Sequence, residues 1–481
     1  MKGITIMKKL VSILLVCVLM FGAMSLTSVS GNETTGTPDP VAKSQEEATV
    51  ENVTNEAPVI ADNEAPAAVE DEALAPVVND TTPVTLENNS SKEGISMSDL
   101  SDLMQPFFSS KTIKDESVMF LDKGDVKTLL YPIDKIISVT SSDEKTVYKE
   151  GVDYEVVNGR LKVLENSSIP CITRATYYNY SGSRLTTIYN GQAVPTFWGE
   201  SQMAQWQVSV TYTHSSEWNG FKQPCQSDVF ENFIKKLQNG EDVTVFFSGD
   251  SITAGANSSF NGNYAPYVRT YPMLFCEALA DLYGYTVKYI YVKDNLTNTA
   301  PRIPSEDYVA GTNGTITYIN TAVGGWRSAH GVSNIQSYIL DYINKYGCDL
   351  LVLAYGMNDR HTHNNAPTRN NLKIITDSVL KIAPDANVAL VATMVHNPNS
   401  NDNNAFEKMQ MGDDIMNLAE YYRASGVPCG VCDMGSVCLS LLVRKEFQDF
   451  SGNNINHPND FFHRVYAQTL LQTVIGYENM N

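Results

Sequence analysis

The chain has 481 residues, of which 43% are hydrophobic, and a formal net charge of -20 at pH 7. That length exceeds one ordinary domain and is sufficient for two folded units with sizeable cores. The acidic excess argues against nucleic acid or anionic membranes as partners, because both would repel such a surface, whereas neutral sugars would not be repelled.

Residues 1–30 have the pattern of a cleaved signal peptide. Lys2, Lys8 and Lys9 precede an apolar run over residues 10–24, and small residues follow. An uncleaved membrane anchor is the alternative, but the run is shorter than the ~20 residues that a spanning helix needs. We therefore expect a secreted or cell-surface protein without stable membrane insertion after cleavage. The mature chain would carry 31 basic and 54 acidic residues, a net charge of -23.

The next segment, residues 31–98, is predicted to be a disordered acidic linker. Residues 31–95 contain fourteen acidic residues and six prolines but no aromatic residue. Such a composition cannot bury enough apolar surface to offset the entropy lost on ordering.

Residues 99–228 show the alternation of β-strands. The segment 153–163 contains Asn158-Gly159 between two short apolar runs, which is a strong hairpin signal. Trp206, Val208, Val210 and Tyr212 alternate with polar residues in the same way. The pattern predicts an all-β domain, resembling a sandwich or jelly roll. Its aromatic residues could stack on sugar rings, but packing in the core is their commoner use.

Residues 229–481 alternate between apolar runs and amphipathic segments, which predicts a doubly wound α/β domain. The expected strands are residues 243–247, 287–292, 315–319, 350–354, 388–395 and 430–433. The expected helices are residues 273–283, 335–346, 372–382, 407–423 and 464–475. In such folds ligands bind outside the carboxyl ends of the strands, where the strand order reverses.

Candidate functional residues follow three of these strands and precede the last helix. Ser251 follows the first strand, Gly325 the third and Asn358 the fourth, while His457 lies in a polar loop. Each has an ordinary structural interpretation, as a helix cap, a turn or a local Asx bond. Together and in this order they supply a hydroxyl, a base and two donors for an oxyanion, the parts that acyl transfer from serine requires.

The other histidines and the cysteines are weaker candidates. His463 is expected in the first turn of the last helix, in a surface or capping role. His361 and His363 have no neighbouring ligand cluster, so we expect no metal site. Cys429 and Cys432 lie in an expected strand and are interpreted as core residues rather than as a redox or zinc pair.

The four blocks resemble those of the SGNH (GDSL-type) hydrolases. Gly249-Asp250-Ser251-Ile252-Thr253 is similar to the first block, 320–325 to the second, 356–359 to the third and 457–459 to the fifth. The resemblance covers roughly residues 240–478. It implies a flavodoxin-like three-layer α/β/α fold, no cofactor or metal, and ester hydrolysis through an acyl-serine. It also implies that the oxyanion is held by the Ser251 amide, Gly325 and Asn358.

The chain departs from that family at Asn454, where an aspartate usually precedes the histidine by three residues. Asn454 could orient His457 through its carbonyl oxygen, as asparagine does in papain-like sites. A backbone carbonyl, Asp433 or Asp449 could do so instead, or the site could be slow or inactive. With a working site, Asn454→Asp is predicted to change activity modestly.

The substrate prediction rests on secretion, on the acidic surface and on the β-domain that precedes the hydrolase region. This organisation resembles bacterial carbohydrate esterases and suggests an acetylated polysaccharide or oligosaccharide. The alternatives are a lipase, lysophospholipase or thioesterase of the same fold, and a non-catalytic glycan-binding protein on a degenerate hydrolase scaffold. A metal phosphoesterase is disfavoured because the sequence lacks the further ligands it would need.

Overall fold

The computed structural model describes residues 97–180, 186–189, 192–197, 199–292, 301–359, 366–399 and 405–479. The predicted signal peptide, the linker up to residue 96, and His361 and His363 lie outside these residues. Residues Glu93–Asn481 group into one compact unit, which holds both the β-rich and the α/β regions. The domain boundary near residue 228 stays a prediction.

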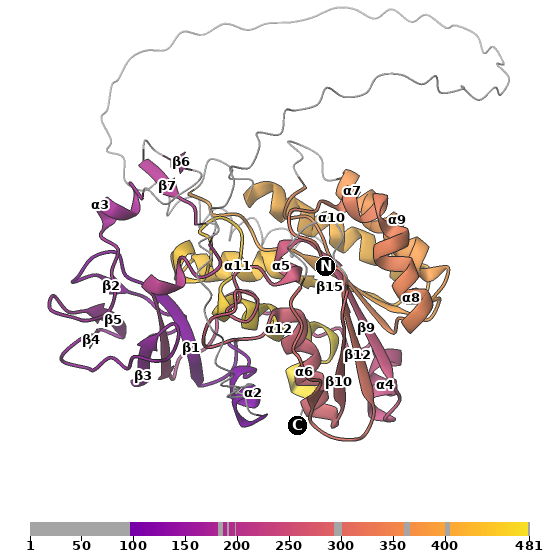
Figure 1. Cartoon of the computed structure of the whole chain (residues 1–481), viewed down its shortest axis with the longest axis horizontal. Helices are drawn as coiled ribbons and strands as arrows, with labels where there is room; N and C mark the ends of the chain where they lie inside the picture. The colour runs from indigo at the N-terminus through magenta and orange to yellow at the C-terminus, as the bar shows by residue number, and fades with distance from the viewer. Residues whose placement is uncertain are drawn as a thin grey trace, which may run out of the picture. The chain divides into compact units, whose positions relative to one another are not determined.

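The N-terminal part of this unit is β-rich, as expected (Figure 1). Its antiparallel sheets are β1-β8-β3, β2-β5-β4 and the pair β6-β7. The predicted hairpin is β4-β5, and its turn residues Asn158 and Gly159 have φ of 52° and 73°, the left-handed conformation that two-residue hairpins favour. The strand bounds are β1 (Thr112–Met119), β2 (Val126–Lys127), β3 (Lys135–Ser141), β4 (Tyr154–Val157), β5 (Arg160–Val163), β6 (Thr186–Tyr189), β7 (Gln192–Pro195) and β8 (Gln207–Thr213). Short helices are α2 (Met97–Leu103), α3 (Arg174–Tyr177) and η1 (Ala204–Trp206).

The C-terminal part is built on a seven-stranded sheet of order β11-β10-β12-β9-β13-β14-β15. All neighbours are parallel except the edge strand β11. Without β10 and β11 the order is that of a flavodoxin-like sheet, with the switch point at β9. The strands are β9 (Val243–Gly249), β10 (Thr286–Ile290), β11 (Tyr308–Val309), β12 (Thr315–Asn320), β13 (Leu350–Ala354), β14 (Asn387–Ala392) and β15 (Cys429–Asp433).

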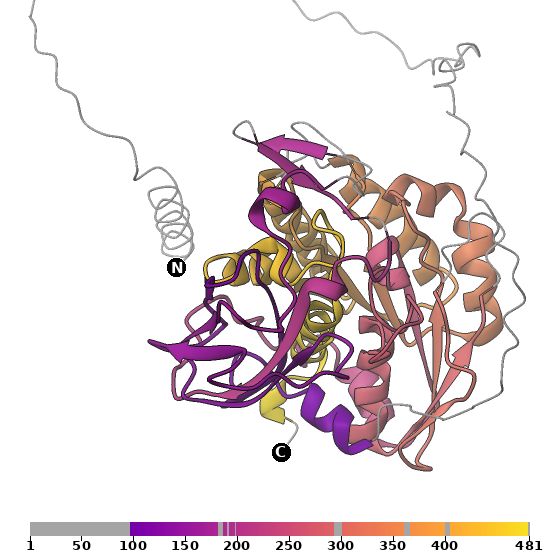
Figure 2. The ribbon, with the colours of Figure 1, turned by 60° about the vertical axis from the view of Figure 1, so that its left-hand side comes forward.

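Helices cover both faces of the sheet, which gives the expected three layers (Figures 1 and 2). Val245 and Phe247 belong to one buried core with α4, α6, α11 and α12, while Phe246 belongs to the opposite core with α8, α9 and α10. The helices are α4 (Glu231–Gln238), α5 (Ser251–Ala254), α6 (Tyr271–Tyr283), α7 (Ser328–Ser333), η2 (Gln336–Leu340), α8 (Asp341–Tyr346), α9 (Ala366–Leu380), α10 (Ala405–Ala424), α11 (Met434–Leu442), η3 (Phe447–Asp449), α12 (Asp460–Val474) and η4 (Tyr477–Asn479).

The expected helix over residues 335–346 is π-helical in its first half and α-helical in its second. Two of the described helices that have eight or more residues, α4 and α11, were not predicted, nor were the shorter helices α2, α3, α5 and α7. Most of α11 is buried, so its sequence lacks the polar stripe by which an amphipathic helix is recognised. Among the described residues no helix is both long and apolar enough to cross a bilayer.

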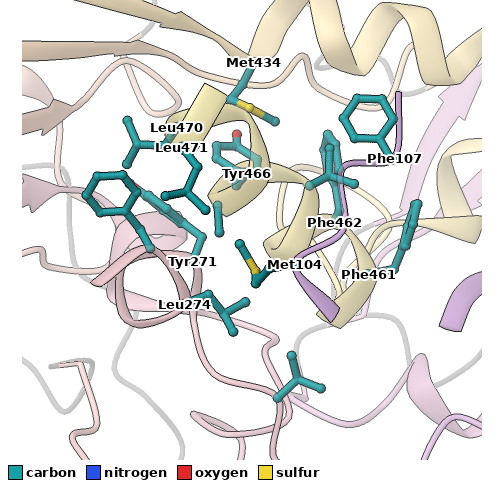
Figure 3. Close-up of a cluster of buried hydrophobic side chains, with 14 of the residues drawn as sticks. Met104, Phe107, Tyr271, Leu274, Met434, Phe461, Phe462, Tyr466, Leu470 and Leu471 are labelled. Carbon is teal, nitrogen blue, oxygen red and sulfur yellow. The ribbon is translucent and has the colours of Figure 1, made fainter. Parts of the chain in front are cut away.

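The β-rich and α/β regions share one apolar core. Met104 and Phe107, which precede β1, belong to the same cluster as Tyr271 of α6 and Phe461 of α12 (Figure 3). The two regions therefore cannot separate without exposing apolar side chains to water.

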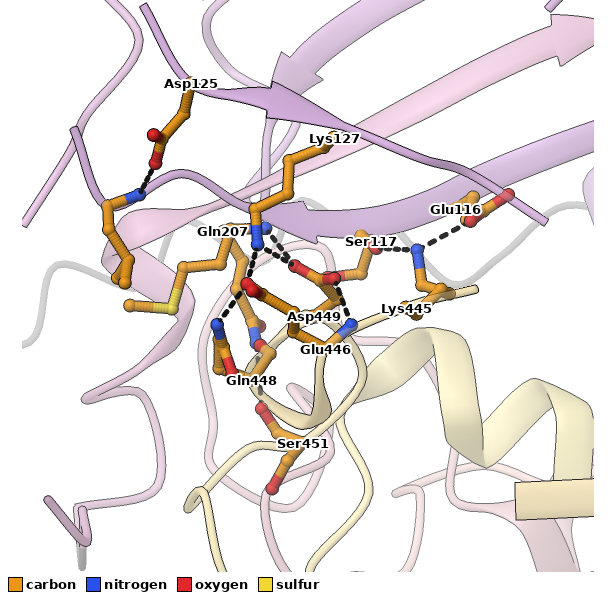
Figure 4. Close-up of polar contacts among 12 residues, drawn as sticks. Glu116, Ser117, Asp125, Lys127, Gln207, Lys445, Glu446, Gln448, Asp449 and Ser451 are labelled. Carbon is orange, nitrogen blue, oxygen red and sulfur yellow. Dashed lines mark hydrogen bonds and ion pairs between the residues drawn. The ribbon is translucent and has the colours of Figure 1, made fainter. Parts of the chain in front are cut away.

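Polar side chains also cross between the two regions. Lys445 donates to a carboxylate oxygen of Glu116 at 2.6 Å, and both side chains are fully buried. Nearby, Asp449 accepts from the backbone N–H of Met119 and pairs with Lys127 (Figure 4). Because a buried charge without its partner is costly, these contacts tie the two regions to each other.

Candidate active site

Ser251 begins the short helix α5, directly after the central strand β9. The side chain of Asp250 caps this helix by accepting from the N–H of Ile252 at 3.0 Å. Gly249 lies so close to β13 that a Cβ would come within 2.8 Å of the Ala354 carbonyl oxygen, so only glycine fits. The close packing of Gly249 against β13 places Ser251 at the carboxyl edge of the sheet, where Ser251 is 8% exposed.

His457 lies in the loop between η3 and α12, and the structure brings it to Ser251. Its Nε2 is 2.8 Å from the serine Oγ. Burial, together with the neighbouring His463 and His396, lowers the pKa of His457 to about 3. The imidazole is therefore neutral at neutral pH, and its Nε2 is able to accept the serine proton.

Asn257 is the partner of the second ring nitrogen. Its Oδ1 lies 2.8 Å from Nδ1 of His457, so Nδ1–H donates to the amide oxygen when Nε2 accepts from Ser251. Asn257 is buried, and its φ of 63° is left-handed, a conformation that asparagine tolerates. The sequence gives little sign of this role. Its only signal is the place of Asn257 six residues after Ser251, shortly beyond the first block.

Asn454, the residue predicted to orient His457, faces elsewhere. Its Nδ2 donates to the Pro195 carbonyl at 2.8 Å and to the Tyr177 hydroxyl at 2.6 Å, while its Oδ1 accepts from Asn397. The interpretation of Asn454 as a histidine partner is wrong in this structure, because Asn257 occupies Nδ1 of His457.

The two acidic alternatives are also engaged at other places. The carboxylate of Asp433 caps α11, where it accepts from the N–H and the hydroxyl of Ser436. Asp449 belongs to the polar contacts between the two regions. Both carboxylates stabilise the fold rather than the imidazole.

The loops that carry Gly325 and Asn358 follow β12 and β13, the two neighbours of β9. Gly325 has a φ of 76°, and a Cβ there would meet nothing within 4 Å. Asn358 donates one amide hydrogen to the Trp326 carbonyl at 2.9 Å. An amide nitrogen carries two hydrogens, and among the residues that the structure describes only one of them has a partner, so the second could serve a ligand. The predicted donors thus lie in the two loops that flank the loop of Ser251.

Two side chains tie these loops together. Asn320 donates to the Thr253 carbonyl at 2.7 Å, which links the second block to the first. The carboxylate of Asp359 accepts from the backbone N–H and the hydroxyl of Ser328, which links the third block to the segment after Gly325. Such contacts fix the loops before a substrate arrives, which is what oxyanion stabilisation requires.

His463 is fully buried, so its expected surface or capping role is wrong. Its Nε2 donates to the Ala256 carbonyl at 3.2 Å, and burial lowers its pKa to about 4. Cys429 and Cys432 are buried in β15, which confirms their interpretation as core residues. Within the described ranges, no three His, Cys, Asp or Glu side chains are grouped closely enough to hold a metal ion.

Residues 245–464 match the family model of the GDSL-like lipases and acylhydrolases. This segment is a GDSL-type, or SGNH, hydrolase domain. The match supports carboxylic ester hydrolysis as the chemistry of this segment. No curated protein matches the chain in sequence.

Several solved structures resemble the chain. A two-domain esterase active on acetylated mannans, crystallised with mannopentaose, is 20% identical, with a TM-score of 0.35 over 52% of this chain and 53% of that one. The match therefore spans about half the length of that esterase. An acetylxylan esterase from Geobacillus stearothermophilus is 14% identical, with a TM-score of 0.35 over 48% of this chain and 94% of that one. A family 3 carbohydrate esterase from Talaromyces cellulolyticus is 14% identical, with a TM-score of 0.32 over 47% and 94%.

Proposed function

We propose that the protein is a secreted serine esterase that removes O-acetyl groups from polysaccharides or oligosaccharides through an acyl-serine intermediate. The observation that carries the catalytic part is the 2.8 Å contact between Ser251 Oγ and Nε2 of a neutral His457. A hydroxyl beside a neutral, partly buried imidazole is the pair that nucleophilic attack on an ester needs.

In the proposed first half-reaction, Ser251 Oγ attacks the ester carbonyl while Nε2 of His457 takes its proton. The oxyanion that forms accepts hydrogen bonds from the N–H groups of Ser251 and Gly325 and from the free amide hydrogen of Asn358. Losing one such donor typically costs ~3 to 4 kcal/mol of transition-state stabilisation. The imidazolium then gives its proton to the departing sugar oxygen, and the acyl group stays on the serine.

In the second half-reaction, His457 takes a proton from water, which attacks the acyl-serine. The tetrahedral intermediate collapses, Ser251 Oγ recovers its proton from His457, and the carboxylic acid is released. Throughout, Asn257 Oδ1 accepts from Nδ1–H and keeps the ring in the tautomer that leaves Nε2 free. Asn257 carries no charge, so it orients the ring without the charge stabilisation that an aspartate would add.

The substrate class is supported by the predicted signal peptide, by the acidic surface that tolerates neutral sugars, and by the resemblance to carbohydrate esterases. The test is acetate release from acetylated xylan, mannan and pectin by the wild type and by Ser251→Ala. Wild-type release that disappears in the variant supports the proposal.

Two other outcomes would each point to an alternative. Cleavage of long-chain acyl esters or thioesters without acetate release would indicate a lipase, lysophospholipase or thioesterase. Failure of a serine-directed phosphonate to label Ser251 would indicate a degenerate hydrolase scaffold with a binding role.

A further inference from the structure

We propose that Glu200, which belongs to the β-rich region, is a positioning residue of the hydrolase site. It holds Asn257 in the orientation that His457 requires, so the β-rich region completes the catalytic centre. This inference rests on the proposed esterase function.

The orientation of the Asn257 side chain is decided by the chemistry of its two neighbours. Its Nδ2 faces the main-chain carbonyl of Glu200 at 3.1 Å, and its Oδ1 faces Nδ1 of His457 at 2.8 Å. A carbonyl oxygen only accepts hydrogen bonds, so the NH₂ group must lie on the Glu200 side. The amide oxygen is thereby directed to the imidazole, which fixes Nδ1 as the protonated nitrogen.

The side chain of Glu200 holds the backbone of the same residue. Its carboxylate accepts from the N–H of Asn257 at 2.6 Å. A hydrogen bond to a charged acceptor is stronger than a neutral one, and it compensates the unfavourable left-handed φ of 63° at this position. Glu200 thus fixes both the main chain and the side chain of Asn257.

Other contacts close the remaining sides of Asn257. Gly452, in the loop that carries His457, lies so near that a Cβ would come within 2.3 Å of the Asn257 Cβ. On the other side, the buried His463 donates to the carbonyl of the preceding residue, Ala256. Gly452 and His463 both belong to the α/β region. Glu200 is the support that the β-rich region adds to them.

The β-rich region also holds the loop of His457 at a second place. The N–H of Phe197 donates to the Asn453 carbonyl at 3.0 Å, and the Pro195 carbonyl accepts from Asn454 at 2.8 Å. Pro195, Phe197 and Glu200 therefore contact the loop that carries His457 as well as Asn257 itself. A detachable binding module would not need such contacts with the catalytic loops.

The experiment compares Glu200→Ala and Glu200→Gln in the full-length protein, with acetate release from acetylated xylan as the readout. Alanine removes the acceptor, whereas glutamine keeps an oxygen that is able to bind the Asn257 N–H. We expect kcat to fall by about 10- to 100-fold in Glu200→Ala with KM unchanged, since small misplacements of catalytic groups have effects of this size. Glu200→Gln should recover most of that loss.

A second readout separates positioning from a merely structural role. If Asn257 moves, water reaches His457, and the acidic limb of the kcat/KM profile should move upward in pH toward the ordinary histidine pKa of ~6.5. A role in stability alone would lower the melting temperature and leave this profile in place. Glu155→Ala is the matched control, because Glu155 lies in the same region but pairs with Lys162 at the surface.

The inference would be overturned by a Glu200→Ala protein whose kcat and acidic limb equal those of the wild type. If Glu200→Ala does not fold, Glu200→Asp replaces it, because the shorter side chain falls short of the Asn257 N–H. An Asp variant equal to Gln in kcat would then contradict the inference. Failure of the proposed function is a separate result, namely no ester hydrolysis and no phosphonate labelling of Ser251 in the wild type.

Discussion

The substitution Asn454→Asp restores the aspartate that related hydrolases have, and the structure predicts that it damages this protein. Asn454 is fully buried, and its Nδ2 donates to the Pro195 carbonyl at 2.8 Å and to the Tyr177 hydroxyl at 2.6 Å. A carboxylate donates no hydrogen bond, so an ionised aspartate would place a negative oxygen against the Pro195 carbonyl. The alternative is to protonate the acid on folding.

The size of the expected destabilisation follows from the less costly of these two responses, which is protonation of the new aspartate. Protonating an aspartate with an ordinary pKa of ~3.9 costs about 4 kcal/mol at pH 7 and about 1.5 kcal/mol at pH 5. The folded-state pKa of the new acid is raised, so its penalty grows as the pH rises above the unfolded pKa. We therefore expect the free energy of unfolding to fall by about 4 kcal/mol at pH 7 and by about 1.5 kcal/mol at pH 5.

The assay is denaturant unfolding of the wild type and Asn454→Asp at both pH values. Asn456→Asp is the control on the same loop, because Asn456 Oδ1 accepts a hydrogen bond from Asn453 and a carboxylate would accept it equally well. The control should lose little stability. An Asn454→Asp protein as stable as the wild type at pH 7 would refute the reasoning. So would an activity gain of several orders of magnitude, since Asn257 already occupies Nδ1 of His457.

Four further predictions concern the site and the junction between the two regions. Asn257→Ala should lower kcat by about 10³- to 10⁴-fold, as loss of the histidine-orienting group does in serine proteases. Steady-state kinetics on an acetyl ester would measure this loss. A loss under tenfold would exclude the orienting role of Asn257. The acidic limb of kcat/KM should lie well below pH 6.5, because burial lowers the pKa of His457 to about 3, and a limb near pH 6.5 would contradict that assignment. The free energy of unfolding should also fall from pH 6.5 toward pH 4, and His463 should contribute up to about 3 kcal/mol to this fall. The cause is that the pKa of His463 is lowered to about 4 in the folded state, so the unfolded chain binds the proton more readily. Unfolding curves that coincide over this pH range would refute the linkage. Lys445→Ala leaves the Glu116 charge buried without its partner, so the free energy of unfolding should fall by about 3 to 5 kcal/mol, and an unchanged denaturation midpoint would contradict it.

The sequence by itself determined the strand pattern and indicated Ser251 and His457 as the candidate nucleophile and base. Long apolar runs bounded by turns are local signals, so the predicted strands of the central sheet match those observed to within three residues. Ser251 and His457 were found because each lies in a short motif with its own chemistry. The switch point of the sheet then places Ser251 at the edge where a ligand binds.

Only the tertiary structure decided which group orients the histidine. Asn257 contacts His457, which lies 200 residues further along the chain, and Glu200 reaches Asn257 from the turn between β7 and η1. Neither of these two contacts leaves a periodic or local pattern in the sequence. Asn454 occupies the position at which the family has its aspartate, but the packing of Tyr177 and Pro195 turns its amide away from the imidazole. A hydrogen-bond partner is selected by distance in space, and such distances are set when distant segments of the chain pack together.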